Sequence, residues 1–201
     1  MANVKFKILA GLLALALSPQ AFADSGLFVE PALTYEAGST KATYPSPLSD
    51  STGHTNGVGI GARVGFHIAE VIFAGIDARY SKPHFTDSSL NYGATATETN
   101  WGPVVGLQTP LIGLRVWAGY ILGGDLDPDA SGNVDVKYSS ATGYRMGAGF
   151  RVMMVSLNLE YQQLKYGTTT LQQAGPLSGN LSNVKLNDDS WIASVSFPIE
   201  L

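Results

Sequence analysis

The sequence has no cysteine, so disulfides and a lipid attached through a thiol are excluded. Charge is also scarce, because charged residues make up 14% of the 201 positions, with 16 acidic residues against 12 basic ones. This acidic balance argues against nucleic acid as a partner. No apolar run approaches the ~20 residues of a membrane-spanning helix, since the longest, Ile8 to Leu17, has about ten.

The N-terminus has the parts of an export signal. Lys5 and Lys7 form a basic start, the apolar run ends before Pro19, and Ala21-Phe22-Ala23 supplies small residues at the spacing that a signal peptidase reads. We expect residues 1–23 to be cleaved rather than kept as an anchor, and the remaining residues 24–201 to form one domain. Removing the two lysines leaves 10 basic residues against 16 acidic ones.

The chain is rich in alternation, most clearly from Asn56 to Ile68. The apolar residues of this stretch are Val58, Ile60, Ala62, Val64, Phe66 and Ile68. The residues between them are Gly57, Gly59, Gly61, Arg63, Gly65 and His67. A period of two predicts a β-strand. A soluble half-buried strand would carry Lys, Glu and Thr on its outer face, so an oily face backed by glycines and one arginine favours a transmembrane β-barrel.

The same pattern predicts eight strands along the chain. The expected strands are residues 27–37, 56–68, 71–81, 101–108, 111–122, 142–152, 155–162 and 190–201. Long connections at 38–54, 82–100, 123–141 and 165–188 alternate with short ones, which is typical of an up-and-down antiparallel barrel with both ends on the short-turn side. Pro103 makes the fourth strand the least regular, because proline donates no ladder hydrogen bond, and we expect a neighbouring bulge to accommodate it.

Charged residues within the expected strands avoid the apolar faces. The predicted lumen charge network is Glu30, Glu36, Arg63, Asp77, Arg79, Arg115, Arg145, Arg151 and Glu160. Eight strands enclose a lumen just wide enough for side chains, which favours a lumen filled by paired charges, with inward glycines making room for the arginines. A narrow, anion-preferring pore is the alternative interpretation.

Aromatic residues on the apolar faces are sorted by height. The predicted girdle at the long-loop end is Tyr35, Tyr80, Trp101, Tyr120, Tyr144, Tyr161 and Trp191. Phe66, Phe150 and Phe197 lie toward the other end. Two membrane interfaces select this arrangement.

Residues 24–201 as a whole resemble the small eight-stranded outer-membrane barrels of the OmpA and OmpX type. The resemblance rests on patterning, and it implies a location in the bacterial outer membrane, contact with its lipid and lipopolysaccharide, and insertion by the barrel-assembly machinery. Two features depart from that group. The chain ends in Phe197-Pro198-Ile199-Glu200-Leu201, so Phe197 or Leu201 must serve as the terminal assembly signal, and we expect no peptidoglycan-binding domain after the last strand.

Two groups of residues invite a chemical interpretation. The acidic stretch from Asp125 to Asp135 spaces its oxygens like a calcium loop, but it has Ala130 and Val136 where an EF-hand has glycine and glutamate. Weak divalent-ion binding there is a hypothesis beside a solvated acidic loop. His84 with Asp87 and Ser88 suggests a lipid-modifying enzyme, although their spacing matches no motif, and we expect His67 to be hydrogen-bonded in the lumen.

We therefore expect an all-β barrel with no catalytic residues, no cofactor and no metal. Its leading function is structural or surface-interacting, through adhesion or envelope integrity, because loops such as 167–187 are rich in Ser, Thr, Asn and Gly. Host and neighbouring-cell surfaces are the candidate partners beyond the membrane. A small-solute pore is the second hypothesis, and a lipid A-modifying enzyme is the third.

Overall fold

The computed structural model describes residues 26–47, 49–68, 71–87, 92–109, 113–131, 134–174, 176–181 and 183–201. The export signal expected at residues 1–23 lies outside these ranges. No helix within them is long and apolar enough to cross a membrane, a finding that concerns helices only.

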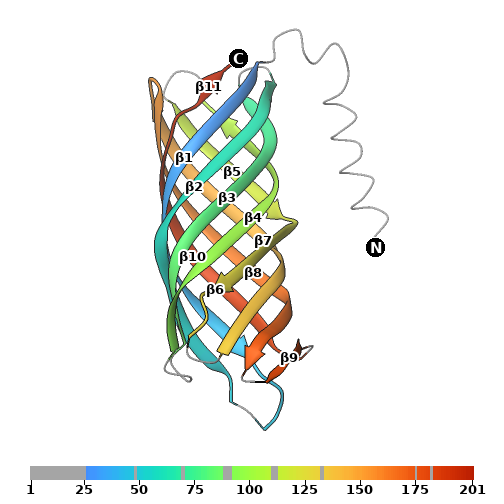
Figure 1. Cartoon of the computed structure of the whole chain (residues 1–201). Helices are drawn as coiled ribbons and strands as arrows, with labels where there is room; N and C mark the ends of the chain where they lie inside the picture. Colours follow the sequence, from blue (N-terminus) through green and yellow to red (C-terminus); the bar gives the residue numbers. More distant parts are fainter. Residues whose placement is uncertain are drawn as a thin grey trace, which may run out of the picture.

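The described chain is a ring of antiparallel strands (Figure 1). The strands are β1 (Leu27–Thr43), β2 (Ser51–Ile68), β3 (Ile72–Asp87), β4 (Tyr92–Gln108), β5 (Leu114–Ile121), β6 (Gly123–Pro128), β7 (Val134–Val152), β8 (Val155–Ala174), β9 (Leu177–Asn180), β10 (Lys185–Ser196) and β11 (Ile199–Glu200). β1 to β4 pair in sequence order, both β5 and β6 pair with β4 and β7, β7 pairs with β8, β8 pairs with β10, and β10 pairs with β1 to close the ring. Because β5 and β6 share one position and β10 and β11 share another, the barrel has the eight strand positions that the sequence predicts.

Both shared positions lie beside a proline. Between the pairing of β4 with β5 and its pairing with β6, the two residues Gly102 and Pro103 lie opposite three residues, 120–122. The extra residue on the β5–β6 side is a β-bulge. Pro198 separates β10 from β11, since it has no N–H to continue the ladder. The bulge expected near Pro103 is therefore present, on the strand that follows.

The apolar faces point outward along the middle of the barrel. Val58 is 67% exposed and Leu157 is 61% exposed, whereas Arg63, on the opposite face of β2, is 5% exposed. An exterior of exposed Val, Leu, Ile and aromatic side chains is stable only against hydrocarbon. Lipid therefore bathes this face, as the alternation predicts.

The strands continue far into the segments expected to be long connections. For example, β1 runs to Thr43, β7 begins at Val134, and β8 runs to Ala174. Most of residues 38–54, 82–100, 123–141 and 165–188 is therefore wall, and the prediction of long loops there was wrong. The reason is a change of phase: in β8, Leu159 faces outward, but Leu164 and Tyr166 face inward with Lys165 outside.

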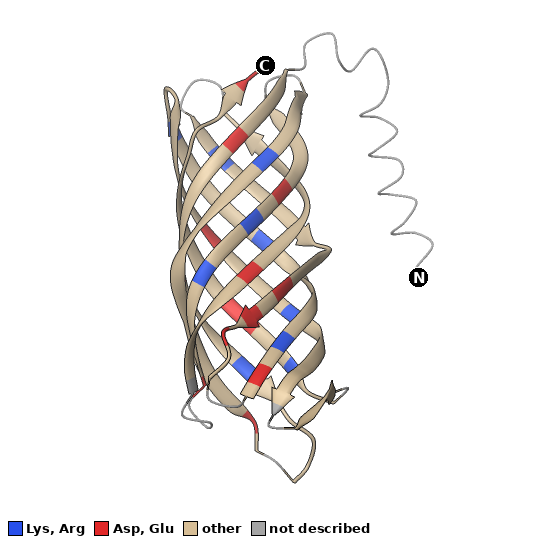
Figure 2. Ribbon diagram, viewed as in Figure 1, with Lys and Arg blue, Asp and Glu red and all other residues tan. Residues whose placement is uncertain are grey.

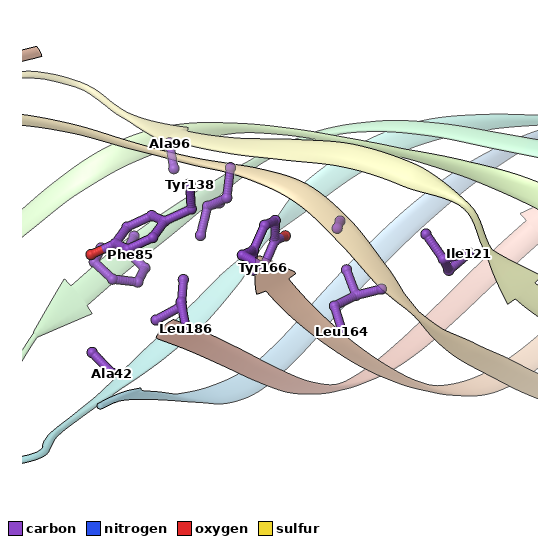
Figure 3. Close-up of a cluster of buried hydrophobic side chains, with 10 residues drawn as sticks. Ala42, Phe85, Ala96, Ile121, Tyr138, Leu164, Tyr166 and Leu186 are labelled. Atoms are coloured by element: carbon purple, nitrogen blue, oxygen red, sulfur yellow. The ribbon is translucent and has the colours of Figure 1, made fainter. Parts of the chain in front are cut away.

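This change of phase places an apolar cluster inside the barrel at the end that carries β9 (Figure 3). Its members are Ala42, Phe85, Ala96, Ile121, Leu126, Tyr138, Ala141, Leu164, Tyr166 and Leu186. Tyr138 lies 6.3 Å from Phe85 and 6.4 Å from Tyr166 between ring centroids. Polar-out and apolar-in is the pattern of a strand in water, so we name this part of the wall, beyond the aromatic girdle, the projecting barrel.

Candidate functional site

The centre of the lumen is organised around Asp77 on β3, in the region where Figure 2 shows red and blue segments along the strands. Its carboxylate accepts hydrogen bonds from Arg63 at 3.0 Å, Arg79 at 3.1 Å and Arg145 at 2.7 Å. Arg79 also donates to both oxygens of Glu160 at 2.7 Å. Because Asp77 on β3 is joined to Arg63 on β2 and Arg145 on β7, and Arg79 on β3 is joined to Glu160 on β8, the network fixes the relative positions of these strands.

Glu30 forms the second centre, closer to the short-turn end. Arg115, which is 1% exposed, donates to both its oxygens at 2.7 Å in a bidentate pair. Arg63 lies 3.7 Å from Glu30 and so joins this pair to Asp77, while Ser196 donates to Glu30 at 2.6 Å. A bidentate guanidinium–carboxylate pair with added hydrogen bonds is the geometry that offsets the cost of burying both charges.

Two inward aromatic rings complete this part of the lumen, and the sequence interpretation did not assign them a role. The guanidinium carbon of Arg63 lies 4.9 Å from the Trp117 ring, and that of Arg115 lies 5.2 Å from the Phe73 ring. The indole of Trp117 also donates to Glu160 at 3.2 Å. A Cβ on Gly147 would lie 2.6 Å from Trp117, so this glycine makes room for a ring and not for an arginine. The signal was available, since both rings alternate onto the charged face.

Seven of the nine predicted network residues are thus joined in one cluster of four arginines and three carboxylates. Glu36 lies apart from it. Its partner is the hydroxyl of Ser81 at 3.0 Å, and its charged neighbours include Asp188 and Glu98, neither of which the sequence singled out. The strand pattern missed these two because both lie in segments expected to be loops.

Glu98 and Asp188 lie in the projecting barrel, three residues beyond the girdle positions Trp101 and Trp191. Burial raises the pKa of Asp188 to about 6, although Ser190 and Thr55 donate hydrogen bonds to it. Burial and the nearby carboxylates raise the pKa of Glu98 well above its usual range. This cluster therefore retains protons at pH values where exposed carboxyl groups have lost them.

Arg151 also lies apart, at the short-turn end. It donates to Glu200 at 3.0 Å, and His67 lies 3.2 Å from the other oxygen of that carboxylate. His67 packs against Phe28 with ring centroids 4.7 Å apart. These contacts join β2, β7 and the terminal β11, so they hold the last strand against the rim.

The aromatic residues at the long-loop end face outward from the barrel. Exposures range from 38% for Tyr144 to 57% for Trp191, and Tyr161 is half-buried. Tyr161 lies between the other two, 6.3 Å from Tyr144 and 5.3 Å from Trp191. On β7, β8 and β10 the girdle is consequently a continuous surface of three rings.

The remaining sequence candidates do not converge on a site. Asp125 and Asp127 lie on β6, where the Lys137 ammonium is 3.4 Å and 3.7 Å from them and occupies the position a cation would need. His84 is exposed on the outer face of β3 and Asp87 is buried on its inner face, while Ser88 lies outside the described residues. Among the described residues, no group of three His, Cys, Asp or Glu side chains could hold a metal ion.

Two small spaces in the lumen are lined by residues that the structure describes. A cavity of about 10 Å³ lies among Glu30, Arg79 and Glu160, and another of about 10 Å³ lies between Pro103 and Arg145. That volume corresponds to about one water molecule. Neither cavity is wide enough for a hydrated ion.

Comparison with solved structures shows the same fold in small bacterial outer-membrane barrels. The match to outer membrane protein OprG from Pseudomonas aeruginosa covers 88% of this chain and 96% of OprG, at 9% sequence identity and a TM-score of 0.50. The match to outer membrane protein AlkL covers 88% of this chain and 91% of AlkL, at 13% identity and a TM-score of 0.50. The match to Neisserial surface protein A covers 85% of this chain and 96% of that protein, at 16% identity and a TM-score of 0.45. No protein-family model and no curated protein matches the sequence.

These findings confirm the expected architecture. The chain is an all-β outer-membrane barrel of eight strand positions, and its apolar exterior and its fold place it in the bacterial outer membrane.

Proposed function

We propose that this barrel is a closed structural and surface-interaction protein, not a channel and not an enzyme, and that residues 1–23 direct its export. The lumen supplies the main support. Four arginines and three carboxylates occupy its centre, and the apolar cluster fills the projecting barrel above them. A solute would have to break buried ion pairs, pass the buried carboxyl groups of Glu98 and Asp188, and then cross the packed apolar cluster.

The outer end of the molecule supports contact with other surfaces. The β8–β9 hairpin extends beyond the part of β8 that pairs with β10, and Leu177 on it is 67% exposed with Leu181 just after it at 36%. Exposed leucines on a protruding hairpin are typical of contact surfaces, since water does not stabilise them. The candidate partners are host surfaces, neighbouring cells and the outer-membrane lipid itself.

Planar-bilayer conductance tests the closed lumen. The purified protein should give no steps above those of an empty bilayer, and regular steps would support the small-solute pore instead.

Adhesion tests the hairpin. Cells displaying Leu177→Ser with Leu181→Ser should bind a cultured epithelial surface several-fold less than cells displaying the parent chain. Asn180→Ser on the same hairpin is the control and should bind as the parent does. Equal binding by all three would remove the hairpin from the proposal, provided that heat-modifiable mobility shows each barrel folded.

The catalytic alternative has its own test. A lipid A deacylase or acyltransferase activity that His84→Ala abolishes would contradict the proposal. None is expected, because His84 and Asp87 lie on opposite faces of β3.

A further inference from the structure

One part of the outer wall combines features that no role described so far uses. Three lysines lie on the outward faces of β8, β10 and β1 beyond the girdle: Lys165, Lys185 and Lys41. Their register makes them neighbours, because Asn187 pairs with Lys165 on one side and with Lys41 on the other, and Lys185 lies two residues further along β10. We call this group the lysine ledge.

The ledge lies further along β8 and β10 than the rings of Tyr161 and Trp191, on the same outward face. One layer of polar groups separates the two: Tyr161 donates to Asp189 at 3.0 Å and Gln163 donates to the same oxygen at 2.7 Å. Away from the membrane, this face presents aromatic rings, then hydrogen-bonding groups, then ammonium groups. A lipid presents acyl chains, then sugar hydroxyls and phosphates in the same direction, so each layer of the wall meets a group that it can bind.

The height of the ledge also fits. Lys165 lies four residues beyond Tyr161, which corresponds to about 10 Å along the barrel axis for strands tilted by about 40°. Aromatic girdles lie at the headgroup level, and a lysine stem can reach several ångströms back toward the membrane. The ammonium group of Lys165 can therefore reach the layer where lipid phosphates lie, and Lys185, six residues beyond Trp191, lies further out at about 15 Å above the girdle.

Charge distinguishes this wall from its neighbour. Lys165 and Lys185 have no ion pair among the described residues, and Lys41 is paired with Asp50 at 3.0 Å. On the β6–β7 wall, by contrast, the single ammonium of Lys137 lies between two aspartates. An anion is therefore attracted more strongly to the ledge than to the β6–β7 wall, because on the β6–β7 wall two aspartates outnumber one lysine.

We infer that the wall formed by β8, β10 and β1 binds the phosphorylated glycolipid of the outer leaflet, with Lys165 and Lys185 on its phosphates and the three rings against its sugar and proximal acyl chains. The inference does not depend on the closed lumen or on the leucine hairpin, so adhesion and conductance tests leave it untouched. It gives the membrane contact of this barrel a defined place and a lipid class.

The experiment measures binding of bis-phosphorylated lipid A to the purified full chain in detergent micelles, by native mass spectrometry across a lipid titration. Lys165→Ala with Lys185→Ala should weaken binding by about 30-fold, since each interfacial lysine attracts anionic lipid by about a factor of five. Lys137→Ala is the control on another wall, because this ammonium already lies between two aspartates, and it should stay within about twofold of the parent. Heat-modifiable mobility confirms that all three proteins are folded.

Two further arms identify the ligand. Lipid A without phosphates should bind the parent protein about as weakly as phosphorylated lipid A binds the Lys165→Ala with Lys185→Ala variant. Millimolar inorganic phosphate should not displace phosphorylated lipid A from the parent protein. A loss of binding in the Lys137→Ala control as large, per lysine, as that in the Lys165→Ala with Lys185→Ala variant would mean that general surface charge attracts the lipid, and would overturn the inference. Displacement by inorganic phosphate would reduce the ledge to a free-anion site and would overturn the lipid assignment.

Discussion

Asp77→Asn is the sharpest test of the ion-paired lumen. Asparagine has the shape of aspartate, so the change removes a charge without leaving a cavity. Three arginines lose their shared carboxylate, and four guanidinium groups then face only Glu30 and Glu160. Removing one partner of a buried ion pair costs about 3–5 kcal/mol, because the other charge stays buried without compensation.

Urea unfolding in phosphatidylcholine vesicles, followed by tryptophan fluorescence, measures this cost. With a dependence of about 2 kcal/mol per molar urea, a loss of 4 kcal/mol lowers the unfolding midpoint by about 2 M. The control is Asp77→Asn with Arg145→Gln, which restores the balance to one excess positive charge. Its midpoint should recover by more than half, because the two changes act on one interaction.

A midpoint for Asp77→Asn within about 0.3 M of the parent would refute the reasoning. It would mean that water or a counterion reaches Asp77 and its arginines, so that the lumen is wet and not filled by its own charges.

Three further changes have definite expected outcomes. Arg115→Ala with Arg145→Ala should stay silent in planar bilayers, because the apolar cluster still closes the projecting barrel after two guanidinium groups are removed from the lumen; regular conductance steps in the folded variant would show that the ion pairs alone close the barrel. Lowering the pH from 8 to 5 should raise the urea midpoint, because the pKa of Asp188 is raised to about 6 in the folded protein, so that its ionised form opposes folding by about 3 kcal/mol above pH 6. About half of this penalty is removed by pH 5, and the rest only as the pH falls below about 4, where the unfolded chain also binds the proton. Asp188→Asn should show a smaller pH-dependent gain, although Glu36 and Glu98 beside it still titrate. Gly147→Ala should destabilise the barrel by about 1–3 kcal/mol, since the added methyl group overlaps Trp117, and the combination with Trp117→Phe should recover part of that loss in the same assay.

Alternation between hydrocarbon and lumen could be predicted from sequence because a one-residue slip of β2 or β7 would place Arg63 or Arg145 in lipid. This cost keeps a regular period of two in the sequence of the membrane-spanning strands. From that period the strands, the outward girdle and the arginine-bearing face could be identified. The projecting barrel could not be found in the same way. Its strands follow the pattern of strands in water, so Leu164 and Tyr166 fall on the face that Arg145 and Glu160 occupy lower down. The alternation continues there, but the apolar residues have changed from the outer face to the inner one.

The ion pairing of individual residues was also beyond the pattern. Sequence placed Glu36 and Asp77 on one face, but only the tilt and register of the closed ring decide that Asp77 meets three arginines while Glu36 meets Ser81. Glu98 and Asp188 went unnoticed for a related reason, since each belongs to a stretch of Thr, Asn and Asp that is typical of loops and is here held in a sheet by its neighbours.

The reversed phase beyond the girdle also determines how far the molecule reaches. On β1 the wall continues eight residues past Tyr35, or about 20 Å of rigid sheet with its own apolar interior. Under the proposed surface-contact role, this rigid wall would hold the hairpin ends beyond the sugars closest to the membrane, where a large object approaching the cell would meet them first.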